Sequence, residues 1–438
     1  MAPVVRRGGF ARLLGASAIT NLGDGVGVVA YPWLASLVTR DPALVAAVVA
    51  AQRLPWLVVT LPAGVWTDRL DRRRVIVASD LFRGAVTLLV ATVVSVRLAA
   101  HADPAGTVGT DVALYGLVVG ATVAVGCAEV VRDNAAQTLL PSVVAVADLE
   151  RANGRLWVVE LLTNTFAGPV LGAWLVGLGV AYAVGFDAVS FLLAALVVTT
   201  LPGAYRAVDD RVRRSWWAEA REGLGWLWSH ELLRPLALVL GAMNLASTVS
   251  LSTLVLYSQD VLGGGALGFA AVTMGGGAGG VVAGLVAGRV LDRVGPGRSL
   301  VVVIAGCAAG AVLVGSAPGW PVAAGAFVVT GFLGTVWNVA TVSLRQAIIP
   351  SDLLGRVNSV YRMIAWGAMP VGAVVGGAVV TVASALSDRE TALRATWFVE
   401  AAVYLALLTV APSRLTAARI ERARAEAATR RAAAGPDP

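Results

Sequence analysis

The chain has 438 residues, of which 57% are hydrophobic and only 14% are charged, and its mean hydropathy is +0.77. Soluble domains are about one-quarter charged, so this balance excludes an ordinary soluble protein and indicates a protein that crosses a membrane many times. The net charge of +7 would suggest a nucleic-acid partner in a soluble protein. In a membrane protein arginines set the orientation instead, so no nucleic-acid partner is expected.

Twelve apolar runs follow one another along the chain, each about as long as the 20 residues that a helix needs to cross a bilayer. The first run has arginines before it and no small-residue cleavage site, so we expect a retained span and not a signal peptide. The runs lie near residues 13–38, 43–66, 75–100, 111–132, 156–178, 180–201, 234–258, 266–288, 299–317, 320–344, 359–383 and 392–412. They predict an all-α membrane protein with twelve transmembrane helices.

Arginines gather at alternate joints between these runs, as expected of cytoplasmic loops. Most of them fall on the side of the N-terminus, and Arg83 and Arg132 are included there as residues near helix ends. The arginines on the opposite side are Arg40, Arg97, Arg389 and Arg394. This asymmetry predicts an even number of spans with both termini in the cytoplasm, and we expect a multi-pass protein of the plasma membrane.

The longest polar joint, residues 202–233, separates two bundles of six spans, residues 1–201 and 234–412. Within this linker, tryptophans alternate with charged residues over 215–228, a pattern typical of a helix that lies in the membrane interface. It is either an anchored connection or a regulatory helix. The remaining residues, 413–438, are expected to form a basic cytoplasmic tail, solvated or facing lipid.

Two motifs recur between the halves. Gln137–Pro141 precedes Asn153 and Gly172, and Gln346–Pro350 precedes Asn358 and Gly377 with the same spacing from Asn to Gly. Duplicated six-helix halves related by an axis along the membrane normal are one known transporter design. We therefore expect two pseudo-symmetric six-helix bundles.

The other recurring motif is a charged turn at Gly64, Asp68, Arg69 and Arg72, with a looser copy at Gly288, Asp292 and Arg293. A glycine at a helix end allows close approach of a second backbone, and an acid there can face the positive N-terminus of another helix. Arg72 can pair with acids on neighbouring spans. The alternative is that the arginines only hold this loop inside, which we expect of Arg73 and Arg74.

These motifs resemble the major facilitator superfamily, and more narrowly its branch of enterobactin exporters and macrolide-efflux-like proteins. The resemblance implies that Asp68 caps a helix of the opposite half and that Arg72 pairs with an acid of the fourth span. Asp133 is the leading partner, with Glu129 one turn earlier. Gly168, Pro169 and Gly172 resemble a motif of exporters in the fifth span, although Ala173 departs from it. The matching segments are Leu22–Gly25, Asp68–Arg73, Leu140–Pro141, Arg151–Gly154, Ala167–Gly172 and Gly355–Ser359.

Asp24 is the sharpest single candidate for coupling. It lies about eleven residues, or roughly 16 Å, into the first span, which places it near the midplane of the bilayer. A carboxylate there costs roughly 2.5–3.5 kcal/mol, so it should face the bundle interior. Asp24 is expected to carry protons or to bind a cationic cargo; the alternative is a packing role between Gly23 and Gly25.

Further residues could line a cargo cavity, whereas Asp187 and Glu160 are expected to be structural. The possible lining residues are Asn21, Asn164, Asn244, Asn338 and Trp337. Cys127 and Cys307 lie singly in apolar runs, so no disulfide framework, metal site or cofactor is expected.

The expected function is secondary active transport, with a small organic molecule such as a drug, siderophore or secondary metabolite exported by alternating access. The chain has no GxxxxGK[ST] motif, so ATP is not expected to be its energy source. The proton-motive force is the expected driver, with protons as the coupling ion. The protein is expected to be a monomer in the lipid bilayer. The alternatives are an uptake transporter, a lipid flippase or, from a different class, a membrane-embedded enzyme. The last lacks any catalytic constellation at one interface, so no enzyme activity is expected.

Overall fold

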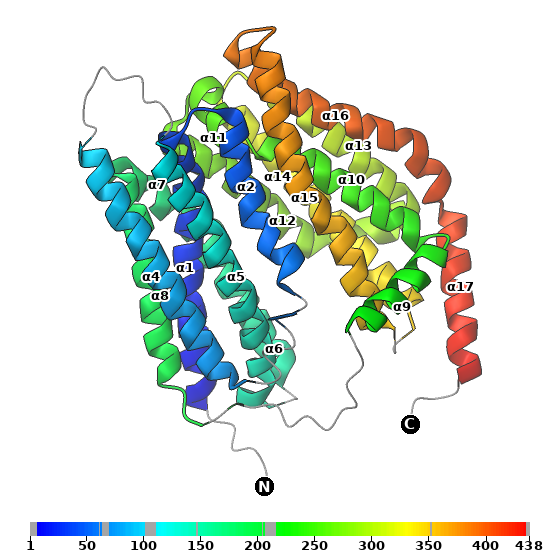
Figure 1. The fold of residues 1–438 in the computed structure, drawn as a ribbon. Helices are drawn as coiled ribbons and strands as arrows, with labels where there is room; N and C mark the ends of the chain where they lie inside the picture. The colour runs from blue at the N-terminus through cyan, green and yellow to red at the C-terminus, as the bar shows by residue number, and fades with distance from the viewer. Residues whose placement is uncertain are drawn as a thin grey trace. The chain divides into compact units, whose positions relative to one another are not determined.

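The computed structural model describes residues 7–60, 62–63, 70–100, 111–145, 148–203, 205, 216–350 and 353–434. Across these ranges the regular elements are all helices (Figure 1). Those of the first half are α1 (Arg7–Val38), α2 (Pro42–Val58), α4 (Arg72–Ala100), α5 (Val112–Val143), α6 (Leu149–Glu160), the π-helical segment η2 (Leu161–Ala167), α7 (Gly168–Leu178) and α8 (Val180–Thr199).

The later elements begin in the linker and continue to the C-terminal tail. They are α9 (Trp216–Ser229), α10 (Leu233–Leu251), α11 (Leu254–Tyr257), the π-helical η3 (Ser258–Leu262), α12 (Gly265–Val294), α13 (Pro296–Gly315), α14 (Trp320–Ile348), α15 (Leu354–Ser384), α16 (Arg389–Arg414) and α17 (Ala417–Ala434).

Eleven helical stretches of the described chain are long and apolar enough to cross a membrane, and the 17-residue α2 is a shorter apolar helix in the place of the expected second span. The all-α fold with twelve membrane helices is therefore confirmed. Several helices run past the predicted boundaries; α5, for example, ends at Val143 where the hydropathy predicted an end near 132. In the extra turns of α5, Leu139, Leu140 and Val143 are buried against residues of α1, α4 and α8, a contact that hydropathy does not detect.

The chain divides into two compact units, Met1–Arg211 with Gly263–Met274 and Val212–Leu262 with Gly275–Pro438. In the first unit α8, the last span of its half, packs against α1 and α4, and Figure 1 shows these helices side by side. In the second unit α16, again the last span of its half, packs against α10 and α13. Each last span thus contacts the first and third spans of its own half, as a duplicated chain requires.

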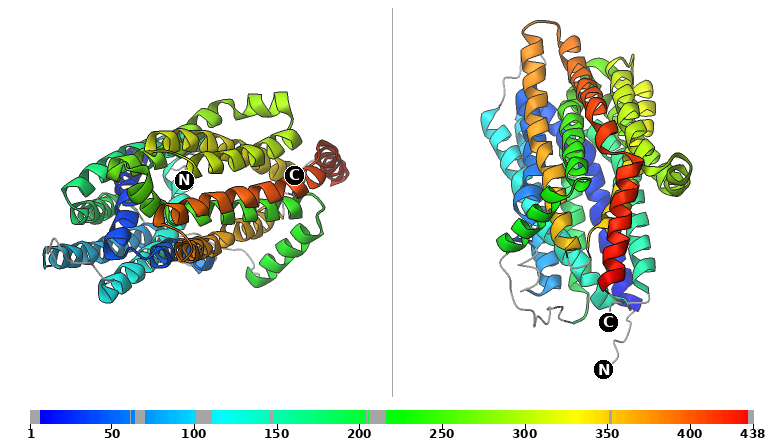
Figure 2. Two further views of the ribbon diagram at one scale, coloured as in Figure 1. Left: turned by 90° about the horizontal axis from the view of Figure 1, so that it is seen from above. Right: turned by 90° about the vertical axis from the view of Figure 1, so that its right-hand side faces the viewer.

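The segments outside the spans are also helical. In the linker, α9 packs on α15, and Glu222 pairs with Arg356 at 2.9 Å. The C-terminal tail, for which we expected a solvated or lipid-facing segment, forms α17, a separate helix after α16 (Figure 2). Its residues Ile420, Ala423 and Ala427 are buried, and it packs on α13 and α14. The tail therefore has an apolar face that its many arginines concealed.

Candidate functional site

The site in the first unit is built around α1, which packs closely between two neighbours. A Cβ atom on Gly23 would lie 2.7 Å from Oδ1 of Asp187 in α8, and one on Gly25 would lie 2.6 Å from the carbonyl oxygen of Asn164 in η2. Neither position has room for a side chain, so the two glycines let α1 approach both helices. Asp24 stands between them.

The Gly168–Gly172 motif supplies the matching surface on α7. A Cβ on Gly168 would lie 2.5 Å from Cα of Gly25, and one on Gly172 would lie 2.8 Å from the carbonyl oxygen of Val26. Pro169 is buried between them. Backbone atoms of α7 and α1 therefore meet directly. This contact sets where Asp24 lies along the bundle and which way its side chain faces.

Asp24 forms an ion pair with Arg83 of α4. Nη2 of Arg83 donates to Oδ1 of Asp24 at 2.6 Å, and the guanidinium lies over the ring of Phe191, 3.8 Å from its centroid. The Arg83 side chain is only 2% exposed. Our placement of Arg83 among the arginines that set orientation was therefore wrong, because this residue is the counter-ion of Asp24 inside the bundle.

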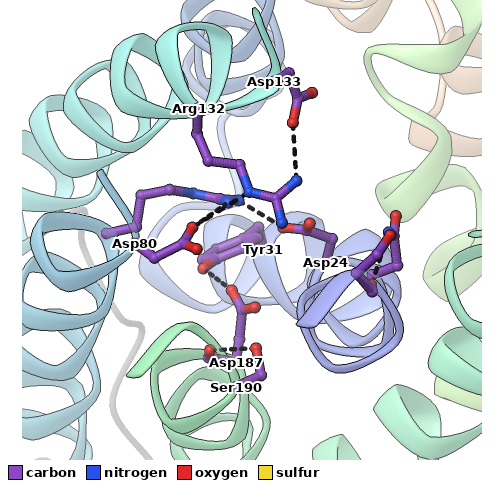
Figure 3. Close-up of polar contacts among 10 residues, drawn as sticks. Asp24, Tyr31, Asp80, Arg132, Asp133, Asp187 and Ser190 are labelled. Atoms are coloured by element: carbon purple, nitrogen blue, oxygen red, sulfur yellow. Dashed lines mark hydrogen bonds and ion pairs between the residues drawn. The ribbon is translucent and has the colours of Figure 1, made fainter. Parts of the chain in front are cut away.

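The ion pair continues into a chain of alternating charges (Figure 3). Nη1 of Arg83 lies 3.7 Å from Oδ1 of Asp80, which is also 3.4 Å from Nε of Arg132, and Nη1 of Arg132 donates to Oδ1 of Asp133 at 3.2 Å. Arg132 is thus a second arginine that we counted as setting orientation and that instead pairs with acids inside the bundle. Charged side chains from α1, α4 and α5 are joined in one network.

Exposure varies along this network. The side chains of Asp24 and Asp133, at its two ends, are 28% and 33% exposed, whereas that of Asp80 in the middle is 0% exposed. Neither carboxylate oxygen of Asp80 accepts a hydrogen bond from a described residue, so the two arginines hold it by charge alone. The network is therefore accessible at its end aspartates and closed at its centre.

A second buried acid adjoins the network from α8. The hydroxyl of Tyr31 donates to Oδ2 of Asp187, and the Ser190 hydroxyl donates to the backbone carbonyl of Asp187 at 2.7 Å (Figure 3). Asp187 is 1% exposed, and its Oδ1 has no hydrogen-bond partner among the described residues. The structural role expected of Asp187 is compatible with the Tyr31 contact, but its carboxylate also adds negative charge beside Arg83.

The proposed partner of Arg72 is not Asp133. Nη1 of Arg72 donates to the carbonyl oxygen of Thr138 at 2.9 Å, while Asp133 pairs with Arg132. The reason is geometric, since Arg72 begins α4 and faces the C-terminal part of α5, beyond the turn that carries Asp133. Glu129 lies one turn before Asp133 and acts electrostatically on Arg83.

The charged turn ties helix ends together within the first unit. Asp71 accepts hydrogen bonds from the backbone N–H groups of Arg74 and Tyr205, each at 3.2 Å, and Arg73 donates to the carbonyl oxygen of Thr199. Cations commonly satisfy the free carbonyls of helix C-termini in this way. Gly64, Asp68 and Arg69 lie outside the described residues, so their expected roles stay predictions.

The second copy of the turn is different. Gly288, Asp292 and Arg293 continue α12 as exposed residues. Neither Asp292 nor Arg293 has an ion-pair partner in the part of the chain that the structure describes. No latch forms at this copy within the second unit.

The possible cavity residues are divided between the two units. In the first unit Nδ2 of Asn21 donates to the carbonyl oxygen of Ser17, and Asn164 lies in η2. In the second unit Nδ2 of Asn244 donates to the carbonyl oxygen of Ala365 at 2.8 Å, Trp337 is buried and Asn338 is exposed. Over the described ranges, no three histidine, cysteine or acidic residues are grouped as a metal site would need.

The sequence reasoning missed three parts of the site: Arg83 as a counter-ion, Asp80, and Tyr31. One signal was available, because Asp80 and Arg83 lie three residues apart within an apolar run, on one face of a helix. Charges inside a membrane span usually point to a buried functional site.

The family model described as Major Facilitator Superfamily matches residues 13–373. The multidrug efflux pump Tap of Mycolicibacterium fortuitum is 28% identical over 386 residues, covering 85% of this chain and 89% of that protein. The Tap pump of Mycobacterium tuberculosis H37Rv is 28% identical over 240 residues, covering 53% and 54%.

Solved structures share the fold at low identity. A structure of the nucleoside transporter NupG superimposes with a TM-score of 0.74 at 13% identity, covering 93% of this chain and 100% of that one. An inward-facing bacterial homologue of the iron transporter ferroportin superimposes with a TM-score of 0.69 at 17% identity, covering 93% and 98%.

Proposed function

The chain belongs to the major facilitator superfamily and is a membrane transporter of small molecules, not an enzyme, and we propose that it exports organic molecules in exchange for protons. The cycle we propose is alternating access, in which two six-helix halves open in turn to either side of the membrane. We also propose that the protein is a monomer in the plasma membrane with both termini in the cytoplasm, and the arginine asymmetry supports that orientation.

The observation that carries proton coupling is the excess of acid in the buried network. Four aspartates, Asp24, Asp80, Asp133 and Asp187, gather around two arginines, Arg83 and Arg132. With every group ionised the cluster would carry two uncompensated negative charges. Uncompensated charge inside a membrane protein is costly, so protons or a cationic cargo would relieve it.

Asp24 is the group at which we propose that this exchange occurs. It is the exposed end of the network on α1, and its partner Arg83 is fixed by burial and by the Phe191 ring. A proton on Asp24 would remove its attraction for Arg83 and free the guanidinium to move toward Asp80. Binding and loss of one proton would thereby change how strongly α1 is held against α4.

Export is favoured over import by two observations. The Tap relatives are named as multidrug efflux pumps, and the Gly168–Gly172 motif, which resembles that of exporters, forms the backbone contact that positions Asp24. A metal ion is a poorer cargo for this site, because the Arg83 guanidinium already occupies the contact position on the Asp24 carboxylate. Bulky organic cations, macrolides and siderophores are the cargo classes to test.

The test uses the purified full-length protein in liposomes with an imposed pH gradient. Ethidium is expected to accumulate by moving in the direction opposite to the proton flow. This accumulation should collapse on addition of an uncoupler. Asp24→Asn should abolish this accumulation at normal protein abundance, because the amide cannot bind and release a proton. Asp148→Asn is the matched control, since Asp148 pairs with Arg151 at the exposed surface.

Three results would contradict the proposal. Transport that ignores the uncoupler would remove proton coupling, and full activity in Asp24→Asn would remove the role of this residue. Cargo movement down the proton gradient in the same direction as protons would show uptake in place of export. Macrolides and siderophores, offered in competition with ethidium, then define the cargo.

A further inference from the structure

A cavity of about 320 Å³ lies inside the second unit, among α10, α12, α13, α14 and α16. Its wall includes Glu400 of α16, Asn244 of α10, Cys307 of α13 and the rings of Phe327, Trp337 and Trp397. Small-molecule pockets usually measure about 300–1,000 Å³, so this one suits a small ligand. It is separate from the Asp24 network, which belongs to the first unit.

Glu400 is the acid of this cavity. It is 7% exposed and accepts a hydrogen bond from the Ser250 hydroxyl, and the Tyr404 hydroxyl also interacts with it. The residues that line the cavity include no arginine or histidine. A carboxylate buried away from cations is costly unless a partner supplies the opposite charge.

Two indole groups at the cavity also lack partners. Trp337 is 2% exposed and Trp397 is 3% exposed, and neither Nε1–H has a hydrogen-bond acceptor among the described residues. Buried polar groups are nearly always hydrogen-bonded, so free donors among the residues that line the cavity indicate an acceptor that the ligand provides. The Trp397 ring meets Phe327 edge-on at 5.9 Å, which gives the wall an aromatic face that suits a cation.

The duplication of the chain explains why this cavity exists. In the first unit Asp187 of the last span accepts a hydrogen bond from Tyr31 of the first span, and in the second unit Glu400 of the last span accepts one from Ser250 of the first. An aromatic residue follows each acid by one helical turn, Phe191 in the first unit and Tyr404 in the second.

The arginine is what the second unit lacks. The offset that relates Gly64 to Gly288 and Asp68 to Asp292 also relates Arg83 to Cys307. In the first unit the Arg83 guanidinium lies over Phe191 and acts on Asp187, whereas Cys307 is a short, neutral side chain that lines the cavity near Glu400. The acid is retained, and the volume of the missing guanidinium is open.

We propose that this cavity binds a small organic cation that carries a hydrogen-bond acceptor, such as an amine with an ether, hydroxyl or carbonyl group. The ammonium group lies where the first unit has the Arg83 guanidinium, and it pairs with Glu400. The acceptor group receives the N–H group of one of the two tryptophans, Trp337 or Trp397. The ligand thereby supplies the one charge and the acceptor that the cavity wall lacks.

The experiment is calorimetric titration of the full-length protein in lipid nanodiscs with 4-methoxybenzylamine and with 4-methoxybenzyl alcohol, a neutral ligand of nearly equal shape. The amine is expected to bind saturably and about tenfold or more tighter than the alcohol, as a hydrogen bond to a charged partner is worth that much. Glu400→Gln should weaken the amine about tenfold or more and leave the alcohol unchanged. Cys307→Arg should abolish binding, because the guanidinium fills the site.

Two controls keep the test independent of folding. Glu390→Gln alters an exposed acid on the same helix and should leave the affinity for the amine unchanged. In a Cys127→Ser background, the amine should slow modification of Cys307 by 2-aminoethyl methanethiosulfonate at least several-fold, which requires no change in the cavity. Absence of saturable binding, equal affinity in Glu400→Gln, or unaltered Cys307 modification would overturn the proposal. Loss of binding in Asp24→Asn in place of Glu400→Gln would move the amine to the first unit and overturn it as well.

Discussion

Replacement of Arg83 by methionine tests whether the charge network holds the first unit together. The side chain is 2% exposed, and its guanidinium contacts Asp24 at 2.6 Å and Asp80 at 3.7 Å. With an effective dielectric constant of about 20, these pairs attract by about 6 and about 4.5 kcal/mol. Desolvation of the ions offsets much of this attraction, and loss of one partner of a buried pair typically costs about 3–5 kcal/mol.

The lower end of that range applies here. Asp80 keeps Arg132 at 3.4 Å after the substitution, and the Asp24 side chain is 28% exposed, so water can solvate it in part. We therefore expect Arg83→Met to lower the free energy of unfolding by about 3 kcal/mol. The assay is reversible unfolding of the purified protein in mixed dodecyl maltoside and SDS micelles, followed by tryptophan fluorescence.

The matched control is Arg151→Met, because Arg151 pairs with Asp148 at 3.0 Å but its side chain is 74% exposed. Exposed pairs contribute about 1 kcal/mol at most, so this variant should unfold almost like the parent. The double variant Arg83→Met with Asp24→Asn should be more stable than Arg83→Met alone, since it neutralises the carboxylate that loses its ion-pair partner. Equal losses in Arg83→Met and Arg151→Met, or purely additive effects in the double variant, would refute the reasoning.

Further predictions concern the contact between α1 and α7 and the charged turn. Gly168→Ala places a methyl group against Cα of Gly25 and should destabilise the protein by about 1–3 kcal/mol with a matching loss of transport, whereas Gly177→Ala, where a Cβ meets nothing within 4 Å, should be harmless in the same unfolding and ethidium assays. Arg72→Asp should impair folding or transport through loss of the bond to the Thr138 carbonyl, and adding Asp133→Arg should give no rescue, because Asp133 pairs with Arg132. Recovery of ethidium transport in that double variant would show that Arg72 and Asp133 do pair during the cycle.

Hydropathy and glycine spacing in the sequence were sufficient to predict the fold. Apolar runs of membrane-spanning length predict helices because a bilayer leaves the backbone no other way to satisfy its hydrogen bonds. The Gly168–Gly172 motif likewise pointed to close packing, and the structure assigns that packing to Gly25 and Val26 of α1. Asp24 was expected inside the bundle on the cost of a carboxylate in the membrane, and its contact with buried Arg83 agrees with that expectation.

The sequence did not reveal which charged side chains pair between helices. The sequence places Arg83 and Arg132 within reach of a cytoplasmic surface, and composition cannot distinguish an arginine that sets orientation from one that is buried. Arg72 was assigned to Asp133 because the family resemblance implies an acidic partner in the fourth span, and Asp133 lies at the expected end of that span. The true ends differ, as α5 continues to Val143 and brings Thr138 to Arg72.

The sequence by itself therefore determined a duplicated, twelve-helix transporter of the major facilitator superfamily, because membrane burial and backbone packing act on each helix through its own residues. Only the tertiary structure decided which charges meet. Arg83 reaches Asp24 from another helix, and Cys307 leaves a cavity beside Glu400 where its counterpart fills the space. Ion pairs depend on distances of a few ångströms between side chains far apart in the chain, and those distances are set by helix register and rotation, which no single segment encodes.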